Sequence, residues 1–164
     1  MIRGWMRALR DLWTRRAARE LLAWHARAAG LVQSCQEAMR PRDMPVDRVA
    51  RLGRMDWALD HLRAHASAVR RPLRRHDRAL SDRLERATDQ AVVLRNQMAS
   101  FFIRWQSHHE AEQEGAPGAY VFRREWEEAL LEARRTARAL AAELDALGPP
   151  LEDLARRWSE RPRG

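Results

Sequence analysis

The sequence has no lysine, a single cysteine and few residues that interrupt a helix. Lysine and arginine together number 31, and every one of them is arginine. Cys35 is the only cysteine. A single cysteine cannot form a disulfide framework, and it is typical of a reducing compartment, so we expect a cytoplasmic protein. Apolar runs are only a few residues long. A membrane span would need about 20 such residues.

The absence of lysine has two interpretations. Arginine binds phosphate in a bidentate manner, and lysine acts as a point charge, so selection for arginine could reflect a nucleic-acid partner. Arginine, alanine, glycine and tryptophan also have GC-rich codons, and a GC-rich bacterial genome is the stronger explanation. The net charge of +8 is better evidence, because a compact chain this basic attracts polyanions.

Length and patterning predict one all-α domain over residues 1–164. The hydrophobic fraction of 45% is too high for a disordered chain. Alternating β-branched and aromatic runs are missing, and apolar residues recur at steps of three and four. We therefore predict an elongated antiparallel bundle of about four long helices plus a short C-terminal helix. An alternative packing has two long hairpins that complete their core as a homodimer.

Proline and glycine mark the expected helix ends. Pro45 and Pro72 flank the second helix, and Gly148-Pro149-Pro150 stops the fourth as a glycine cap followed by proline. The predicted helices cover residues 2–39, 46–70, 73–113, 119–147 and 150–159. Each carries an apolar seam like that of a coiled coil. In the fourth helix the seam is expected to begin at Phe122 and Trp126.

The positive charge belongs to the N-terminal half. Residues 1–82 hold 18 arginines against 9 acids, and residues 83–164 hold 13 against 14. The densest cluster surrounds Pro72, where five arginines fall within nine residues. Aromatic residues are not interleaved there, so we expect backbone binding that is salt-sensitive and tolerant of sequence. The candidate phosphate-binding residues are Arg70, Arg71, Arg74, Arg75 and Arg78.

The first 16 residues form a basic amphipathic helix with tryptophan. Such a helix can lie on a membrane surface or dock on a partner protein. It can also be simply the first turns of the bundle. Trp57 lies off its seam and is a further candidate contact, because exposed tryptophan is enriched at interfaces. The candidate docking residues are Ile2, Trp5, Leu9, Trp13 and Trp57.

Enzymatic signatures are weak. His61 and His65 are four residues apart, a spacing that can present two imidazoles to one metal ion. The Arg…His spacing of HEPN-type ribonucleases occurs at Arg19…His25 and elsewhere, but several matches are unavoidable in an arginine-rich chain. Cys35 lies on a helix seam among alanines and leucines, which favours a packing role. We predict no cofactor and no catalytic residue.

Together these features predict a non-enzymatic accessory protein or subunit of a larger bacterial assembly. Its basic half is expected to bind an acidic partner, with nucleic-acid backbone favoured over an acidic protein surface. The first alternative is a protein- or membrane-docking adaptor that uses residues 1–16. The second is a metal-binding helical bundle or a HEPN-like RNase.

Overall fold

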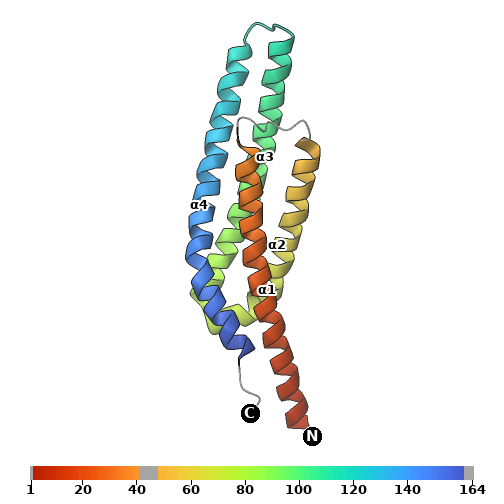
Figure 1. Cartoon of the computed structure of the whole chain (residues 1–164), viewed down its shortest axis with the longest axis vertical. Helices are drawn as coiled ribbons and strands as arrows, with labels where there is room; N and C mark the ends of the chain where they lie inside the picture. Colours follow the sequence, from red (N-terminus) through yellow and green to blue (C-terminus); the bar gives the residue numbers. More distant parts are fainter. Residues whose placement is uncertain (1, 41–47, 161–164) are drawn as a thin grey trace.

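The computed structural model describes residues 2–40 and 48–160, with side chains from residue 12 onward. It consists of four helices, α1 (Ile2–Ala38), α2 (Arg48–His76), α3 (Arg78–Gln113) and α4 (Ala119–Ser159). They run alternately up and down one long axis (Figure 1), which confirms the predicted all-α antiparallel bundle. Within this described part of the chain, none of the helices is long and apolar enough to cross a membrane.

The four helices form a ring around one core. α1 and α3 each pack against both α2 and α4, and α1 meets α3 only across the diagonal. The predicted seams face this centre, where Trp24 and Phe101 are the largest fully buried side chains. The Trp24 Nε1 donates to the Thr88 hydroxyl (3.1 Å), which donates in turn to the Leu84 carbonyl (2.8 Å). These two hydrogen bonds satisfy the buried indole N–H of Trp24 and the buried hydroxyl of Thr88.

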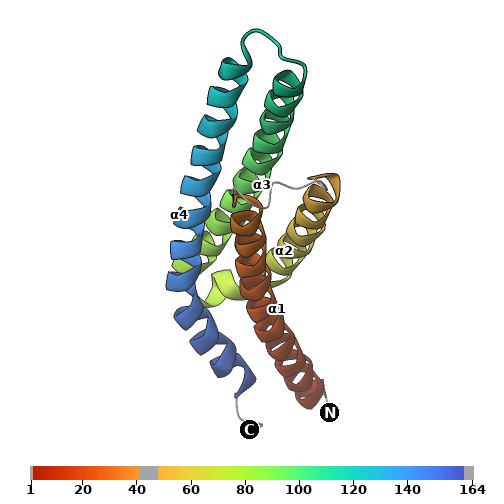
Figure 2. The same cartoon turned by 45° about the horizontal axis from the view of Figure 1, so that its top comes forward.

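The fourth helix does not end at Gly148, which differs from the sequence prediction. α4 continues through Pro149 and Pro150 to Ser159, so the expected C-terminal helix is its last turns. The two prolines remove the partners of the Asp145 and Ala146 carbonyls, but both residues are exposed and water can replace the lost donors. Figure 2 shows the resulting bend in α4 toward α1.

Buried side chains hold the last turns of α4 in helical form beyond the prolines. Leu151, Leu154 and Trp158 are all within the core. At the bend, the His25 Nε2 donates to the Leu144 carbonyl (2.9 Å), which ties α1 to α4. Tertiary packing thus overrides the low helix propensity of proline.

The second helix likewise runs past its proline. α2 includes Pro72 and ends at His76, six residues later than predicted, so residues 73–76 belong to α2 and not to the third helix, which begins at Arg78. The carbonyl that Pro72 leaves without a donor belongs to Ala68, which is exposed. Leu73 is fully buried and anchors the final turn.

The helices are not flush at either end of the bundle. The N-terminal turns of α1 run past the ends of the other helices, and at the opposite end the α3–α4 hairpin stands above α1 and α2 (Figures 1 and 2). The hairpin loop depends on Gly115 and Gly118, whose φ values of 64° and 98° favour glycine. The predicted loop at residues 114–118 is therefore confirmed.

Candidate nucleic-acid interface

The α2–α3 junction carries the predicted phosphate-binding arginines. A single residue, Asp77, separates the two helices with extended φ and ψ angles of −152° and 100°. Its carboxylate accepts a hydrogen bond from the Leu80 backbone N–H (2.9 Å), which caps α3. Its own N–H donates to the Leu73 carbonyl (2.7 Å). The sequence analysis missed this cap, although an aspartate just before an apolar seam is a recognised signal.

The junction brings all five candidate arginines to the surface. Arg71, Arg74 and Arg75 share one side of the last turns of α2, because their spacing is three and four residues. Arg78 opens α3 directly after the turn. All are exposed, as is Arg70. The cationic side chains also complement the negative C-terminal end of the α2 dipole, so part of their role is structural.

Only part of this charge is neutralised within the described chain. Arg70 pairs with Glu85 at 2.9 Å (Nε to Oε1). No acidic side chain of the described residues lies within ion-pair distance of the other four arginines. The nearest carboxylate in sequence, Asp77, is used as the helix cap. We define the junction cluster as Arg71, Arg74, Arg75 and Arg78.

The C-terminal end of α4 lies beside the junction but adds little free charge. The His76 ring contacts the Trp158 ring, with a centroid distance of 5.4 Å. Arg156 and Arg157 both bind Asp153, at 2.5 and 2.9 Å. The hydrogen bond from Arg156 lowers the pKa of the Asp153 carboxyl. Both arginines are therefore already paired with a carboxylate, in contrast to the junction cluster.

The candidate docking residues divide into two groups. On α1, Trp13 is 69% exposed and Leu12 beside it is 68% exposed. Ile2, Trp5 and Leu9 belong to the helical part of α1, but their side chains lie outside the described residues.

Trp57, on α2, is 54% exposed but already has partners. The Arg27 guanidinium lies 4.7 Å from the centroid of its ring, and the His61 ring centroid lies 4.1 Å away. These contacts order the indole at the edge of an open groove of about 750 Å³ between α1 and α2. The α1 wall of this groove combines Gly30 and small side chains with the longer Arg27, Leu31 and Glu37, and Arg51 and Arg54 line it on α2.

The two candidate metal ligands, His61 and His65, each use Nδ1 for a hydrogen bond within the protein. His61 Nδ1 donates to the Trp57 carbonyl (2.8 Å), and His65 Nδ1 donates to Glu20 Oε2 (2.6 Å). Each imidazole thus has its own partner, and His65 serves to tie α2 to α1. Among the residues that the structure describes, no three His, Cys, Asp or Glu side chains gather in a way that could hold a metal ion.

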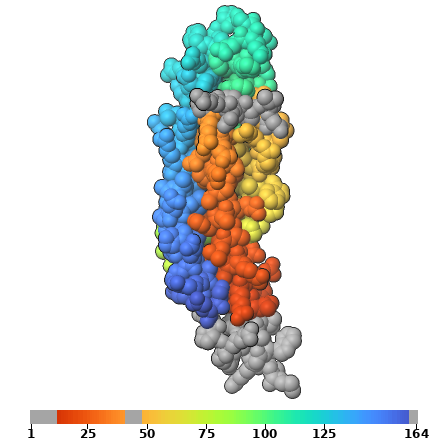
Figure 3. All heavy atoms as spheres, viewed as in Figure 1, coloured from red at the N-terminus to blue at the C-terminus, as the bar shows by residue number. Residues whose placement is uncertain are grey.

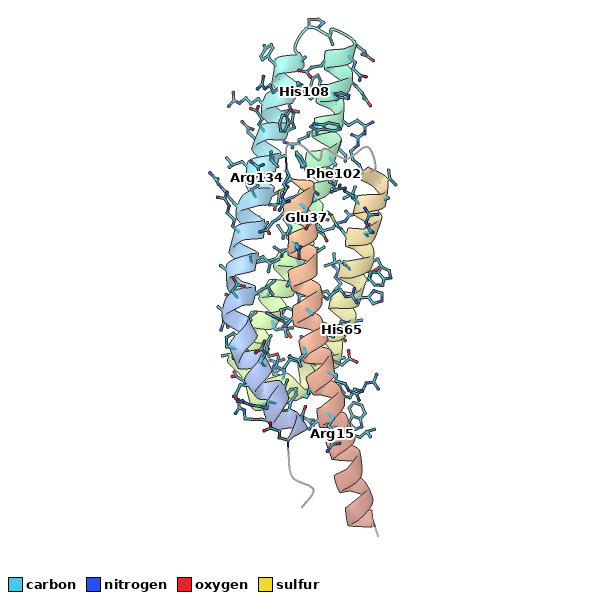
Figure 4. All side chains as sticks on the ribbon, in the orientation of Figure 1. Arg15, Glu37, His65, Phe102, His108 and Arg134 are labelled. Atoms are coloured by element: carbon cyan, nitrogen blue, oxygen red, sulfur yellow. The ribbon has the colours of Figure 1, made fainter. Side chains whose placement is uncertain are left out.

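In two Arg…His pairs of the RNase alternative, Arg19…His25 and Arg104…His109, a member already has contacts of its own. The His25 Nε2 donates to the Leu144 carbonyl of α4. Arg104 donates to the Glu125 carbonyl (3.4 Å), and the His109 ring stacks on Trp105. Figure 4 shows His108, the neighbour of His109, near the hairpin loop, at the far end of the bundle from Arg15.

Comparison of the chain with known proteins gives no relative. No protein-family model, curated protein or solved structure matches it.

Proposed function

We propose that the protein is a non-enzymatic, cytoplasmic accessory factor of a larger bacterial assembly, which binds nucleic-acid backbone at the α2–α3 junction. One observation carries this proposal. Four exposed arginines gather around a rigid one-residue turn and have no ion-pair partner among the described residues. Arginine presents a planar fork of donors that matches phosphate geometry, and unpaired arginines need not break an existing pair to bind.

The geometry favours backbone recognition without base readout. The junction cluster contains no exposed aromatic ring other than His76, which already contacts Trp158. Base stacking on aromatic side chains is the usual basis of single-strand recognition. Binding is therefore expected to depend on phosphate charge, with little preference for sequence.

Salt dependence of binding to a short mixed-sequence DNA duplex tests the proposal quantitatively. Four phosphate contacts predict a slope of log K against log salt of about −3.6, or a loss of about 150-fold between roughly 50 and 200 mM salt. The variant R71Q/R74Q/R75Q retains one contact, so its slope should fall to about −0.9. Fluorescence anisotropy at several salt concentrations measures both values.

A control variant separates the local cluster from overall charge. R123Q/R124Q/R135Q removes the same three charges from exposed positions on α4, two of which are paired with glutamates. It should keep nearly the full slope. If both variants lose binding equally, diffuse charge is responsible and the site assignment is wrong. If poly-glutamate displaces the duplex as effectively as free DNA does, an acidic protein surface is the better partner.

The docking alternative is favoured by a separate observation. Leu12 and Trp13 are more than two-thirds exposed on the part of α1 that runs past the other helices. Exposed apolar residues beside arginine are typical of helices that bind a partner or a membrane surface. Removal of residues 1–16 should abolish such binding and leave binding at the junction cluster intact. Flotation with vesicles that contain anionic lipid tests the membrane form of this alternative.

A further inference from the structure

The hairpin tip, residues 105–130 of α3, α4 and their loop, continues the core of the bundle beyond the helices that should cover it. The α4 seam is buried at Ala129, Ala133 and Ala137. Further toward the tip, Trp126 is half-buried and Phe122 is 38% exposed. Phe122 was predicted to be a core residue, and that prediction is wrong for the single chain. The seam outruns α1, so in its last turns it is covered by α3 alone, where the Trp126 ring centroid lies 6.3 Å from that of Phe101 and 6.1 Å from that of His108.

At the opposite end of the molecule, the first turns of α1 extend past the other helices. The N-terminal segment, residues 2–16 of α1, precedes Ala17, the first described residue that is buried. It is helical but has no neighbouring helix along most of its length (Figure 1). Its described apolar side chains, Leu12 and Trp13, are both exposed. One end of the bundle thus has a helix that projects alone, and the other has a two-helix hairpin that no third helix covers.

The two overhangs are similar in length. The Arg134 guanidinium donates to the Met39 carbonyl at the end of α1 (2.8 Å), so α4 extends over residues 119–133 beyond this point. That is about 15 residues, or roughly 22 Å at 1.5 Å per residue. Residues 2–16 of α1 span about the same distance. A helix of this length can cover the unpartnered seam without meeting the rest of the bundle.

The two overhangs also have opposite charge. Residues 1–19 contain six arginines and one aspartate, and residues 103–128 contain six glutamates and three arginines. Within the hairpin, Arg123 and Arg124 are already paired with Glu127 and Glu128. Glu114 and Glu125 are exposed, and neither has an ion-pair partner in the described part of the chain. Figure 3 shows the hairpin atoms (teal) at the end of the molecule opposite the first described side chains of α1 (red).

We propose that the N-terminal segment of one copy packs against the hairpin tip of a second copy. Leu12 and Trp13 cover the seam at Phe122 and Trp126. Arg15 and Arg19, which have no ion-pair partner in the described structure, approach the glutamates of the tip. Because the contact joins different surfaces of the two copies, it is a head-to-tail contact. It does not depend on the junction cluster, and it gives the docking segment a specific partner.

Sedimentation of the full-length chain over a range of concentrations tests the association. Leu12→Glu or Phe122→Glu should weaken self-association at least about 30-fold, as expected for an interface anchor. The matched controls are Leu22→Glu on α1 and Val93→Glu on α3. Both residues are exposed apolar side chains outside the two overhangs. Association that responds equally to the controls, or a chain that stays monomeric at every concentration, overturns the proposal.

Charge exchange tests which surfaces meet. R15E/R19E and E114R/E125R should each prevent self-association at low salt, since like charges would then face each other. A mixture of the two variants should associate again through the complementary pair. If the mixture remains monomeric while each variant is folded by circular dichroism, the proposed pairing is wrong. R71Q/R74Q/R75Q serves as a charge control and should associate like the natural chain.

Cross-linking gives a direct positional readout. The natural Cys35 is fully buried, and burial raises its pKa to about 12, so it should not compete. With an added thiol oxidant, a chain with Leu12→Cys mixed with a chain with Phe122→Cys should form the mixed disulfide at least about tenfold faster than a mixture in which Val93→Cys replaces Phe122→Cys. Equal rates in the two mixtures would show that the overhangs do not meet.

Discussion

Gly148 offers a direct test of how α4 passes its two prolines. If the helix ended there, glycine would be needed in a left-handed conformation, and alanine would cost about 1 kcal/mol or more. In the structure Gly148 lies within a continuous helix, and its φ is not positive. Alanine is then the better residue, because glycine in a helix interior is about 1 kcal/mol less favourable.

The surroundings of Gly148 leave room for the added methyl group. A Cβ at this position would lie 3.4 Å from His25 Cε1 and 3.5 Å from His25 Nε2, which is ordinary van der Waals contact. The hydrogen bond from His25 to the Leu144 carbonyl can therefore remain. We expect Gly148→Ala to stabilise the fold by about 0.5–1 kcal/mol. The corresponding rise in Tm is about 2–3 °C for a chain of this size.

Two other glycines calibrate the measurement by urea or thermal unfolding. Gly53 lies in the middle of α2 on its exposed side, and a Cβ added there would have no atom within 4 Å. Gly53→Ala should therefore stabilise the fold to a similar extent. Gly118→Ala has a φ of 98° and should destabilise by about 1–2 kcal/mol. A loss of stability for Gly148→Ala as large as that of Gly118→Ala would refute the continuous helix and restore the sequence-based end of α4.

Further predictions concern the core and the junction turn. Thr88→Val should cost about 1–3 kcal/mol in urea unfolding, because the buried Trp24 indole N–H loses its acceptor; a neutral effect would mean that the indole finds another partner. Asp77→Ala should lower the free energy of unfolding by about 1 kcal/mol, because the Leu80 N–H loses its capping acceptor. Asp77→Asn, whose amide oxygen can still accept, should retain most of the stability of the natural chain. The pKa of Cys35 is raised from 9.0 to about 12, so its contribution to stability is complete below pH 9 and is lost as the pH rises toward 12. Unfolding free energy should fall by up to about 1.4 kcal/mol per pH unit in this window, and Cys35→Ala should remove that slope.

The local pattern of the sequence was sufficient to predict most of the core. The seam residues in the later half of the first helix, such as Leu21, Trp24 and Cys35, are buried as expected. Leu12 and Trp13, on the apolar side of its earlier half, are exposed. Helical periodicity encodes which side of each helix is apolar, and that side must be covered in any compact fold. The same pattern could not predict that Phe122 lies beyond the end of α1, since relative helix position is not a local property.

The candidate site was predictable in composition but not in its state of pairing. The sequence showed five arginines around Pro72, and the structure places all five at one turn. It also pairs Arg70 with Glu85, 15 positions later in the sequence on the neighbouring helix. Such pairing across helices depends on the register of α2 against α3, which the sequence pattern leaves open.

The sequence by itself determined the fold class, the four long amphipathic helices and the concentration of positive charge in the first half. These are consequences of residue type and spacing along one chain. Only the tertiary structure decided where the helices end relative to one another. Packing of Leu73, Leu151 and Trp158 against neighbouring helices offsets the hydrogen bonds that the prolines remove, so α2 and α4 continue past them. The same packing leaves one helix and one hairpin projecting, because helices of unequal length cannot cover each other completely.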